Sequence, residues 1–438
     1  MPLFCALLTA LFTIHIYAQP AVPRPEFRNF QPINLPSSQT KQNSYNNYQQ
    51  QNNPFQGNNL PMGATAADII QQTNQNALRA MGVTIPGQPP NRQQQIDELH
   101  QLLNKEKKDE VIRRFQYYLN LFQQLNPDSF SMSKAVYLSE AVYYDKCPPY
   151  EQFEKAIKQK ADIVKKIVKQ EGLNIKNNTA VNYAIQKLFS QDNIIYDAKA
   201  GKDYLVRKIS YDFDDFYGEK DWTKMFVSKI LQTNSGQCHS LPLLYLCIAE
   251  QLHAKAYLSL APNHSFIQYF DSKGMLRSFE TTNGHLVSIS WLMQSDAISS
   301  VAYKNKTYLD TLSQRKLFAE CLADLQMAYI MKNGYDNFSQ FLSQKILAID
   351  SININALMCE ANDAVYRFDD ILTAIGNPPK EELNRYPQLL EAYNNMVAAQ
   401  QKVNQTGYQD MPKEQYIRWL KSIDREKQKM KQSTNPKQ

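Results

Sequence analysis

One cysteine stands where a helix is expected to begin. Cys238 follows a glycine turn, Ser235-Gly236-Gln237, and precedes an apolar run. The apolar positions of that run keep helical spacing: Leu241, Leu244, Tyr245, Ile248 and Leu252. Pro242 lacks an amide hydrogen and fits only the first helical turn. There the free amide hydrogens and the helix dipole favour a nucleophilic thiolate. We therefore predict that Cys238 is a catalytic nucleophile.

A histidine and a carboxylate follow on segments with strand character. His264 opens an alternating, aromatic run over residues 264–270, and Asp271-Ser272-Lys273-Gly274 is typical of a hairpin turn. The returning strand, over residues 275–282, carries Glu280. Cysteine, histidine and acid thus occur in that order on helix, strand and strand. This is the layout of a thiol–imidazole–carboxylate triad.

The register of the hairpin decides whether Glu280 can reach the imidazole. If Phe270 pairs with Gly274 through a three-residue bulged loop, His264 lies opposite Glu280. If Asp271 pairs with Gly274 across a two-residue turn, His264 faces Thr281 instead. Glycine suits the left-handed position of a bulged loop, so we favour the first arrangement. Asn283 is the alternative residue for orienting the histidine.

Two further residues beside the cysteine have expected roles. The amide hydrogen of Cys238, together with the side chain of Gln237, would donate to an oxyanion. His239 points to another side of the helix, and we interpret it as a surface or supporting residue, not as the base. Cys247, in the body of the same helix, is interpreted as a small core residue.

These residues resemble the transglutaminase-like superfamily of papain-type cysteine enzymes. The resemblance rests on the Gly-x-Cys helix start, the strand beginning at His264, and Phe279-Glu280-Thr281-Thr282, where the family usually has Asp-Pro-Thr. Residues 181–189 and 211–218 are similar to the helical lead-in of one bacterial branch, in which tetratricopeptide-like helices follow the core. The likeness covers residues 130–430 and is strongest over 222–284. This chain departs from the pattern in having Glu for Asp and no proline after Glu280.

The resemblance implies an α+β, papain-like and transglutaminase-like core over residues 195–305, with helices on both sides. It also implies acyl transfer from an amide through a cysteine thioester to water, as in a protease or amidase, or to an amine, as in transamidation. The substrate would be a peptide or protein. The alternative is a non-catalytic binding module in which the degenerate core and the helical repeats hold a protein partner.

The remaining sequence divides by composition. Residues 1–18 are an apolar run that ends in a small residue, Ala18, before Gln19, which is typical of a cleaved signal peptide. Residues 19–90 are rich in Asn, Gln and Pro and predict a disordered linker, with one possible short helix over 66–81. Helical periodicity over 91–194 predicts a helical cap region. We therefore expect an exported protein, periplasmic or secreted, with no transmembrane segment after signal removal.

Helices are expected again after the core. Residues 306–430 are predicted to form tetratricopeptide-like hairpins, because the phrase beginning Asn333-Gly334-Tyr335 partly recurs at Thr406-Gly407-Tyr408, an offset of about two repeat units. These helices could offer a concave peptide-binding face or support the core. Residues 431–438 form a basic tail.

Composition narrows the function classes. A net charge of +6 over 438 residues is too modest and dispersed to indicate nucleic-acid binding. The sequence contains no zinc-binding, nucleotide-phosphate or dinucleotide motif, so we expect neither metal nor cofactor. Removing residues 1–18 leaves five widely spaced cysteines, an odd number, which argues against a disulfide framework and for at least one free thiol.

Overall fold

The computed structural model describes residues 92–408, apart from residues 199, 216, 217, 219, 296, 297, 380, 381, 383 and 384. Within this part the chain divides between Glu110 and Val111, inside helix α3, and the fold below concerns the unit from Val111 onward. The predicted signal peptide, the linker with its short helix, and the basic tail lie outside the described residues. None of the described helices is long and apolar enough to cross a membrane.

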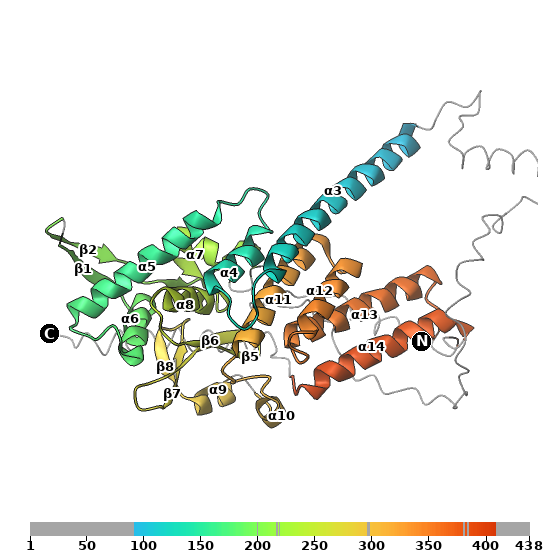
Figure 1. Ribbon diagram of the computed structural model, residues 1–438. Coiled ribbons are helices and arrows are strands. Elements are labelled where there is room, and N and C mark those ends of the chain that lie inside the picture. Colours follow the sequence, from blue (N-terminus) through green and yellow to red (C-terminus); the bar gives the residue numbers. More distant parts are fainter. Residues whose placement is uncertain are drawn as a thin grey trace, which may run out of the picture. The chain divides into compact units, whose positions relative to one another are not determined.

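Within the described residues, four helices precede the first strand (Figure 1). They are α3 (Arg92–Gln123), α4 (Met132–Ala141), α5 (Tyr150–Gln170) and α6 (Asn178–Ser190). Local sequence fixes two of their starts, because the side chains of Ser131 and Asn177 accept hydrogen bonds from the first amides of α4 and α6. The helical periodicity predicted before the core is confirmed.

Short strands and the central helix follow. They are β1 (Asn193–Asp197), β2 (Lys202–Val206), β3 (Ser210–Tyr211), a 3₁₀ turn η1 (Trp222–Met225), α7 (Val227–Thr233), β4 (Ser235–Gly236) and α8 (Ser240–Gln251). Residues 240–249 of α8 are all buried. This helix packs against α4, α5, α6 and α7 and against strands β5 and β6, so it is the centre of the core. Pro242 lies in its first turn, as its missing amide hydrogen predicts.

The main sheet is four-stranded and antiparallel, in the order β5-β6-β7-β8. Its strands are β5 (Tyr257–Ala261), β6 (His264–Phe270), β7 (Leu276–Glu280) and β8 (His285–Val287). Strand β6 has the bounds predicted for it, and all its residues except Phe270 are buried. Two short helices then lead out of the sheet region, α9 (Ile289–Ser295) and α10 (Ser300–Lys304).

The predicted hairpin register is wrong by two residues. Phe270 pairs with Leu276, not Gly274, and Asp271 pairs onward with Met275, whose carbonyl accepts its amide at 2.9 Å. The three-residue loop and the left-handed Gly274 (φ 75°) are present as expected. The pairing differs because the Asp271 carboxylate accepts the amides of residues 273 and 275, which closes the turn one residue later. Continuing this register places Glu280 opposite Phe266, diagonal to His264 on the same face.

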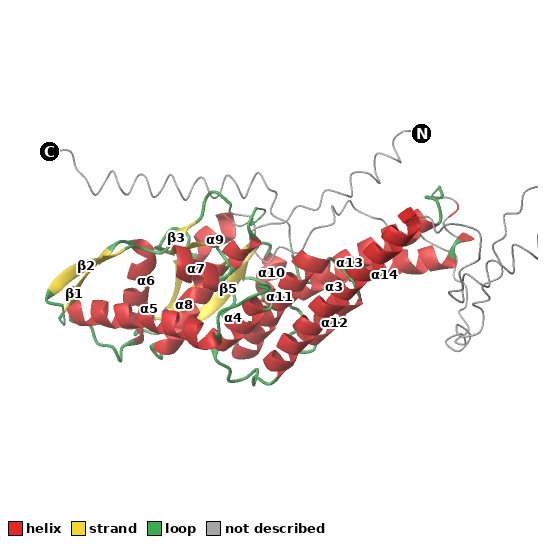
Figure 2. Cartoon of the chain, turned by 90° about the horizontal axis from the view of Figure 1, so that it is seen from above, coloured by secondary structure: helices red, strands yellow, loops and turns green. Residues whose placement is uncertain are grey.

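Helices complete the described chain. They are α11 (Gln314–Asn333), α12 (Asn337–Leu347), α13 (Ile354–Ala374) and α14 (Pro387–Gln405). Gly334 and Gly407, the matching glycines of the recurring phrase, both have positive φ just after a helix, α11 and α14. The second copy of that phrase continues beyond the described residues. Figure 2 shows how helices predominate over strands, and the chain is a mixed helix-and-sheet protein of α+β type.

Candidate active site at the start of helix α8

Strand β4, which pairs in parallel with β3, lies immediately before the start of α8. The amide of Asp212 donates to the carbonyl of Gly236 at 2.9 Å. A Cβ atom on Gly236 would lie 2.4 Å from the Ile230 side chain and 2.8 Å from the Ser240 hydroxyl, so only glycine fits there. Cys238 stands two residues before α8 begins, as predicted, and is completely buried.

The three residues predicted as a triad meet at this point. The Nε2 atom of His264 lies 2.5 Å from Oε2 of Glu280. The Cys238 side chain acts on the same imidazole, since it helps to raise the pKa of His264. His264 and Glu280 are buried like the cysteine. His264 and Glu280 can meet although they are not directly opposite each other. They lie diagonally on the same face of the sheet, and the glutamate side chain is long enough to span the two-residue offset.

Burial and pairing act in opposite directions on the imidazole. Burial alone would lower the pKa of His264, but the charge of Glu280 and the hydrogen bonds to Cys238 and Glu280 outweigh it and raise the pKa well above its ordinary value. The ring is therefore held as an imidazolium beside a thiol. This is the electrostatic setting in which a cysteine side chain acts as a nucleophile.

A tight turn orients the carboxylate. The second oxygen of Glu280 accepts the amide of Thr282 at 2.9 Å and its hydroxyl at 2.8 Å. Gly284 closes the turn at φ 75°, where a Cβ atom would meet the backbone of Phe189 and Ser190 at 2.8 Å. Asn283, the alternative orienting residue, instead accepts the amide of His285, so Glu280 is the residue bonded to His264.

The side chain of Gln237 is engaged elsewhere. Its Nε2 donates to the carbonyls of Asp212 at 3.2 Å and Asp215 at 2.7 Å. These bonds attach the loop after β3 to the residue before the cysteine. The oxyanion role of Gln237 stays a prediction, and the side chain would have to leave these carbonyls to fill it.

His239 is not a surface residue, so the surface interpretation is wrong and the supporting one remains. It is buried, and its Nε2 lies 2.8 Å from Oδ1 of Asp324 on α11. Burial lowers the pKa of His239, but the charge and hydrogen bond of Asp324, with Glu320 and Glu140 beyond, raise it overall. This ion pair connects the start of α8 to α11, one of the helices that follow the sheet. No local sequence signal marks this pair, because its members are far apart along the chain.

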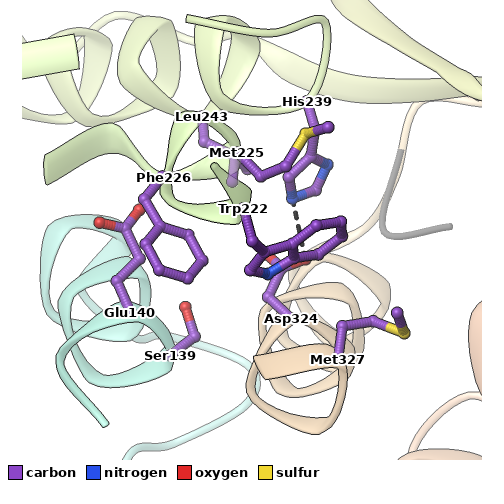
Figure 3. Close-up of a pocket in the computed structure, with 9 residues that line it drawn as sticks. All are labelled: Ser139, Glu140, Trp222, Met225, Phe226, His239, Leu243, Asp324 and Met327. Carbon is purple, nitrogen blue, oxygen red and sulfur yellow. Dashed lines mark ion pairs between the residues drawn. The ribbon is translucent and has the colours of Figure 1, made fainter. Parts of the chain in front are cut away.

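A small hollow with room for about one water molecule, partly open to solvent, lies beside this second pair (Figure 3). Its lining includes Trp222 and Glu140 as well as His239 and Asp324. Burial raises the pKa of Glu140 to about 7, although the amides of Val227 and Ser228 donate to its carboxylate. The lining of the hollow thus comes from α4, η1, α8 and α11 and from residues next to them.

The other thiols of the described chain have no such partner. Cys247, Cys321 and Cys359 are buried, Cys147 is half-buried, and none of the five cysteines forms a disulfide. Burial raises the pKa of the Cys247 thiol well above its ordinary value, as expected for a core cysteine. Over the residues that the structure describes, no three His, Cys, Asp or Glu side chains are grouped so as to hold a metal ion.

Comparisons with known proteins add no relative to this picture. No protein-family model matches the chain, and neither the curated proteins nor the solved structures contain a similar one.

Proposed function

We propose that the chain is a transglutaminase-like cysteine acyltransferase with a papain-like core over residues 195–305. The observation that carries the proposal is the buried chain of contacts from Cys238 to His264 to Glu280. Its members come from a helix start and two antiparallel strands. An ion-paired imidazole beside a thiol is of little use to a core cysteine, whereas acyl transfer requires it.

The proposed chemistry assigns one role to each residue. The Cys238 thiolate attacks an amide carbonyl carbon, forming a C–S bond and an oxyanion. His264 gives its proton to the departing amine as the C–N bond breaks, which leaves a thioester. It then takes a proton from the attacking water or amine, and the thiolate departs. Glu280 keeps the ring oriented and stabilises the imidazolium. Water gives hydrolysis, and an amine gives transamidation.

The substrate class follows from the bond that is broken. We propose a peptide or protein amide as the acyl donor, in an exported, periplasmic or secreted setting, with the helices after residue 306 supporting the core or holding a protein partner. In this proposal, as the sequence predicts, those helices are tetratricopeptide-like and residues 1–18 are a cleaved signal peptide.

One observation favours the second candidate, a non-catalytic binding module. The Cys238 side chain has no exposed surface, and the carbonyl of Asn263 lies 3.8 Å from its sulfur. Acyl transfer therefore requires the residues over the sulfur to move, whereas a binding module requires no such opening. The two candidates differ in whether a carbonyl carbon ever reaches the thiol.

The test is a partition assay on the full chain. Purified protein is incubated with a blocked glutaminyl dipeptide, with and without hydroxylamine, and acid, ammonia and hydroxamate are measured. We expect product from the wild type, with a thioester on Cys238 detectable by intact mass, and none from Cys238→Ser. Cys247→Ser is the matched control and should retain the activity. A wild type that neither releases product nor traps an acyl group, with this donor or a mixed-peptide library, would favour the binding module.

A further inference from the structure

The backbone carbonyl of Cys238 has an unusual position in its helix start. In an α-helix the carbonyl of residue i accepts the amide hydrogen of residue i+4. The preceding residue follows that rule, since the carbonyl of Gln237 accepts the amide of Leu241 at 3.0 Å. For Cys238 the fourth residue onward is Pro242, which has no amide hydrogen to give. The carbonyl of Cys238 therefore has no i+4 amide hydrogen to accept.

A side chain from the sheet takes that place. The hydroxyl of Ser265 donates to the carbonyl oxygen of Cys238 at 2.9 Å. Both residues are completely buried, so water does not compete for this bond. Ser265 directly follows His264 at the start of β6. One hydrogen bond therefore joins the backbone of the thiol residue to the backbone segment that carries the imidazole.

We propose that Ser265 is a positioning residue that uses the donor vacancy created by Pro242 to fix Cys238 relative to His264. This inference rests on the proposed function, because it concerns the alignment of that thiol with that ring. The pair 242 and 265 acts together: the proline frees the carbonyl, and the serine binds it to the strand. A purely structural serine would only satisfy a buried carbonyl, so the two roles predict different behaviour.

A double-mutant cycle separates the roles. Ser265→Ala removes the hydroxyl. Pro242→Ala returns an amide hydrogen at i+4, which can satisfy the carbonyl but cannot attach it to β6. Ser265→Thr keeps the hydroxyl as the conservative variant. Ser259→Ala is the matched control, because Ser259 is a buried serine on the neighbouring strand whose hydroxyl has no hydrogen-bond partner among the described residues.

Two quantities are measured on each full-length variant: the melting temperature and the pH profile of Cys238 alkylation by iodoacetamide. We expect Ser265→Ala to lose about 3 °C and to be alkylated on the order of tenfold more slowly near pH 6.5. Adding Pro242→Ala should restore the melting temperature but not the alkylation rate. Ser265→Thr should keep the wild-type profile, as should Ser259→Ala.

Two outcomes would overturn the inference. One is that Ser265→Ala is alkylated like the wild type, and the other is that Pro242→Ala restores both quantities.

The variant His264→Ala distinguishes a failure of this inference from a failure of the proposed function. If that variant is alkylated like the wild type, the proposed function is wrong, and hydrogen exchange at the Cys238 and His239 amides then decides the positioning claim. Exchange at least about tenfold faster in the Ser265→Ala and double variants, but not in Ser259→Ala, supports the attachment. Unchanged exchange in all of them overturns it.

Discussion

Cys238 and Cys247 lie nine residues apart, and both are completely buried. Cys238 stands before the first turn of α8, beside an imidazole whose pKa is raised by Glu280 and by Cys238 itself. Cys247 lies in the body of the helix, where burial raises the pKa of its thiol well above the ordinary value. In general, burial opposes the ionisation of a thiol, whereas an imidazolium next to a thiol favours the thiolate. The comparison teaches that surroundings, not exposure, set the two apart.

Replacing each cysteine by serine should give the largest difference in acyl-transfer rate between the two positions. Cys238→Ser should reduce acyl transfer by more than about 10³-fold, because a hydroxyl beside the same imidazole is a far weaker nucleophile. Cys247→Ser should leave the rate within about twofold and cost about 1 kcal/mol of unfolding free energy, since a more polar group is buried. Steady-state kinetics and urea unfolding check both. Equal losses of activity at the two positions would contradict the distinction.

Glu280→Gln should have the next largest effect, on the order of 10²- to 10⁴-fold in kcat/KM, because it impairs the histidine as general acid and base. The Thr282 donors would hold the introduced carbonyl oxygen, so its NH₂ group would face Nε2 of His264. Nε2 must then accept, which moves the ring proton to the nitrogen that faces the thiol. The pKa of His264 should also fall, since the opposing charge is lost. NMR titration of the ring and the rate assay should change together, and an unchanged rate would exclude Glu280 from the site.

Gly236→Ala should displace the thiol without touching the triad. The added Cβ would overlap Ile230 and Ser240, costing about 1–3 kcal/mol and about a tenfold loss of activity through misalignment. Gly274→Ala is the control, because that glycine has positive φ but nothing within 4 Å of its Cβ position. It should cost about 1 kcal/mol and leave the rate unchanged. The account of the helix start fails if the two variants behave alike.

Asp324→Asn should affect stability more than chemistry, with the rate within about threefold. In the folded state the pKa of His239 is raised, so its protonation stabilises the fold fully below the unfolded pKa of about 6.5. That contribution is lost as pH rises through the folded pKa. The variant should therefore lose about 3 kcal/mol at pH 6 and less at pH 9.

Unfolding free energies of both proteins across that range check this pH dependence. Glu140 and Glu320 also face His239, with pKa values raised by burial to about 7 and about 8, and both titrate in either protein. The charge of Asp324 raises the pKa of both carboxyls, so the difference between the two curves reports His239, Asp324 and these two groups together. A loss of unfolding free energy that grows toward pH 9 would contradict the assignment of a protonated His239 in the folded state.

Local patterns predicted much of the candidate site. Helical spacing and Pro242 located the start of α8, and the alternating run from His264 gave the bounds of β6. The register was wrong because the side chain of Asp271 closes the turn one residue later than expected. His264 and Glu280 nevertheless meet, since the observed register differs from the favoured one by a two-residue offset, which preserves the face.

Contacts between distant segments could not be read from the sequence. The His239–Asp324 pair depends on how α11 packs behind α8, and the Ser265 bond depends on where β6 crosses the helix start. Neither has a spacing signature, because each joins residues on elements whose approach is set by the core. The burial of Cys238 was missed for the same reason.

The most direct test is the rate of iodoacetamide labelling at Cys238 from pH 5 to 9, in the wild type and in His264→Ala, with Cys247 as the internal reference. Both thiols need an opening of the structure, and the comparison with Cys247 controls for that requirement. The account predicts labelling of Cys238 that is already fast near pH 6 and slows in the variant, with Cys247 unlabelled in both. A rate that rises only near pH 8.5 in both proteins, as for an isolated thiol, would contradict it.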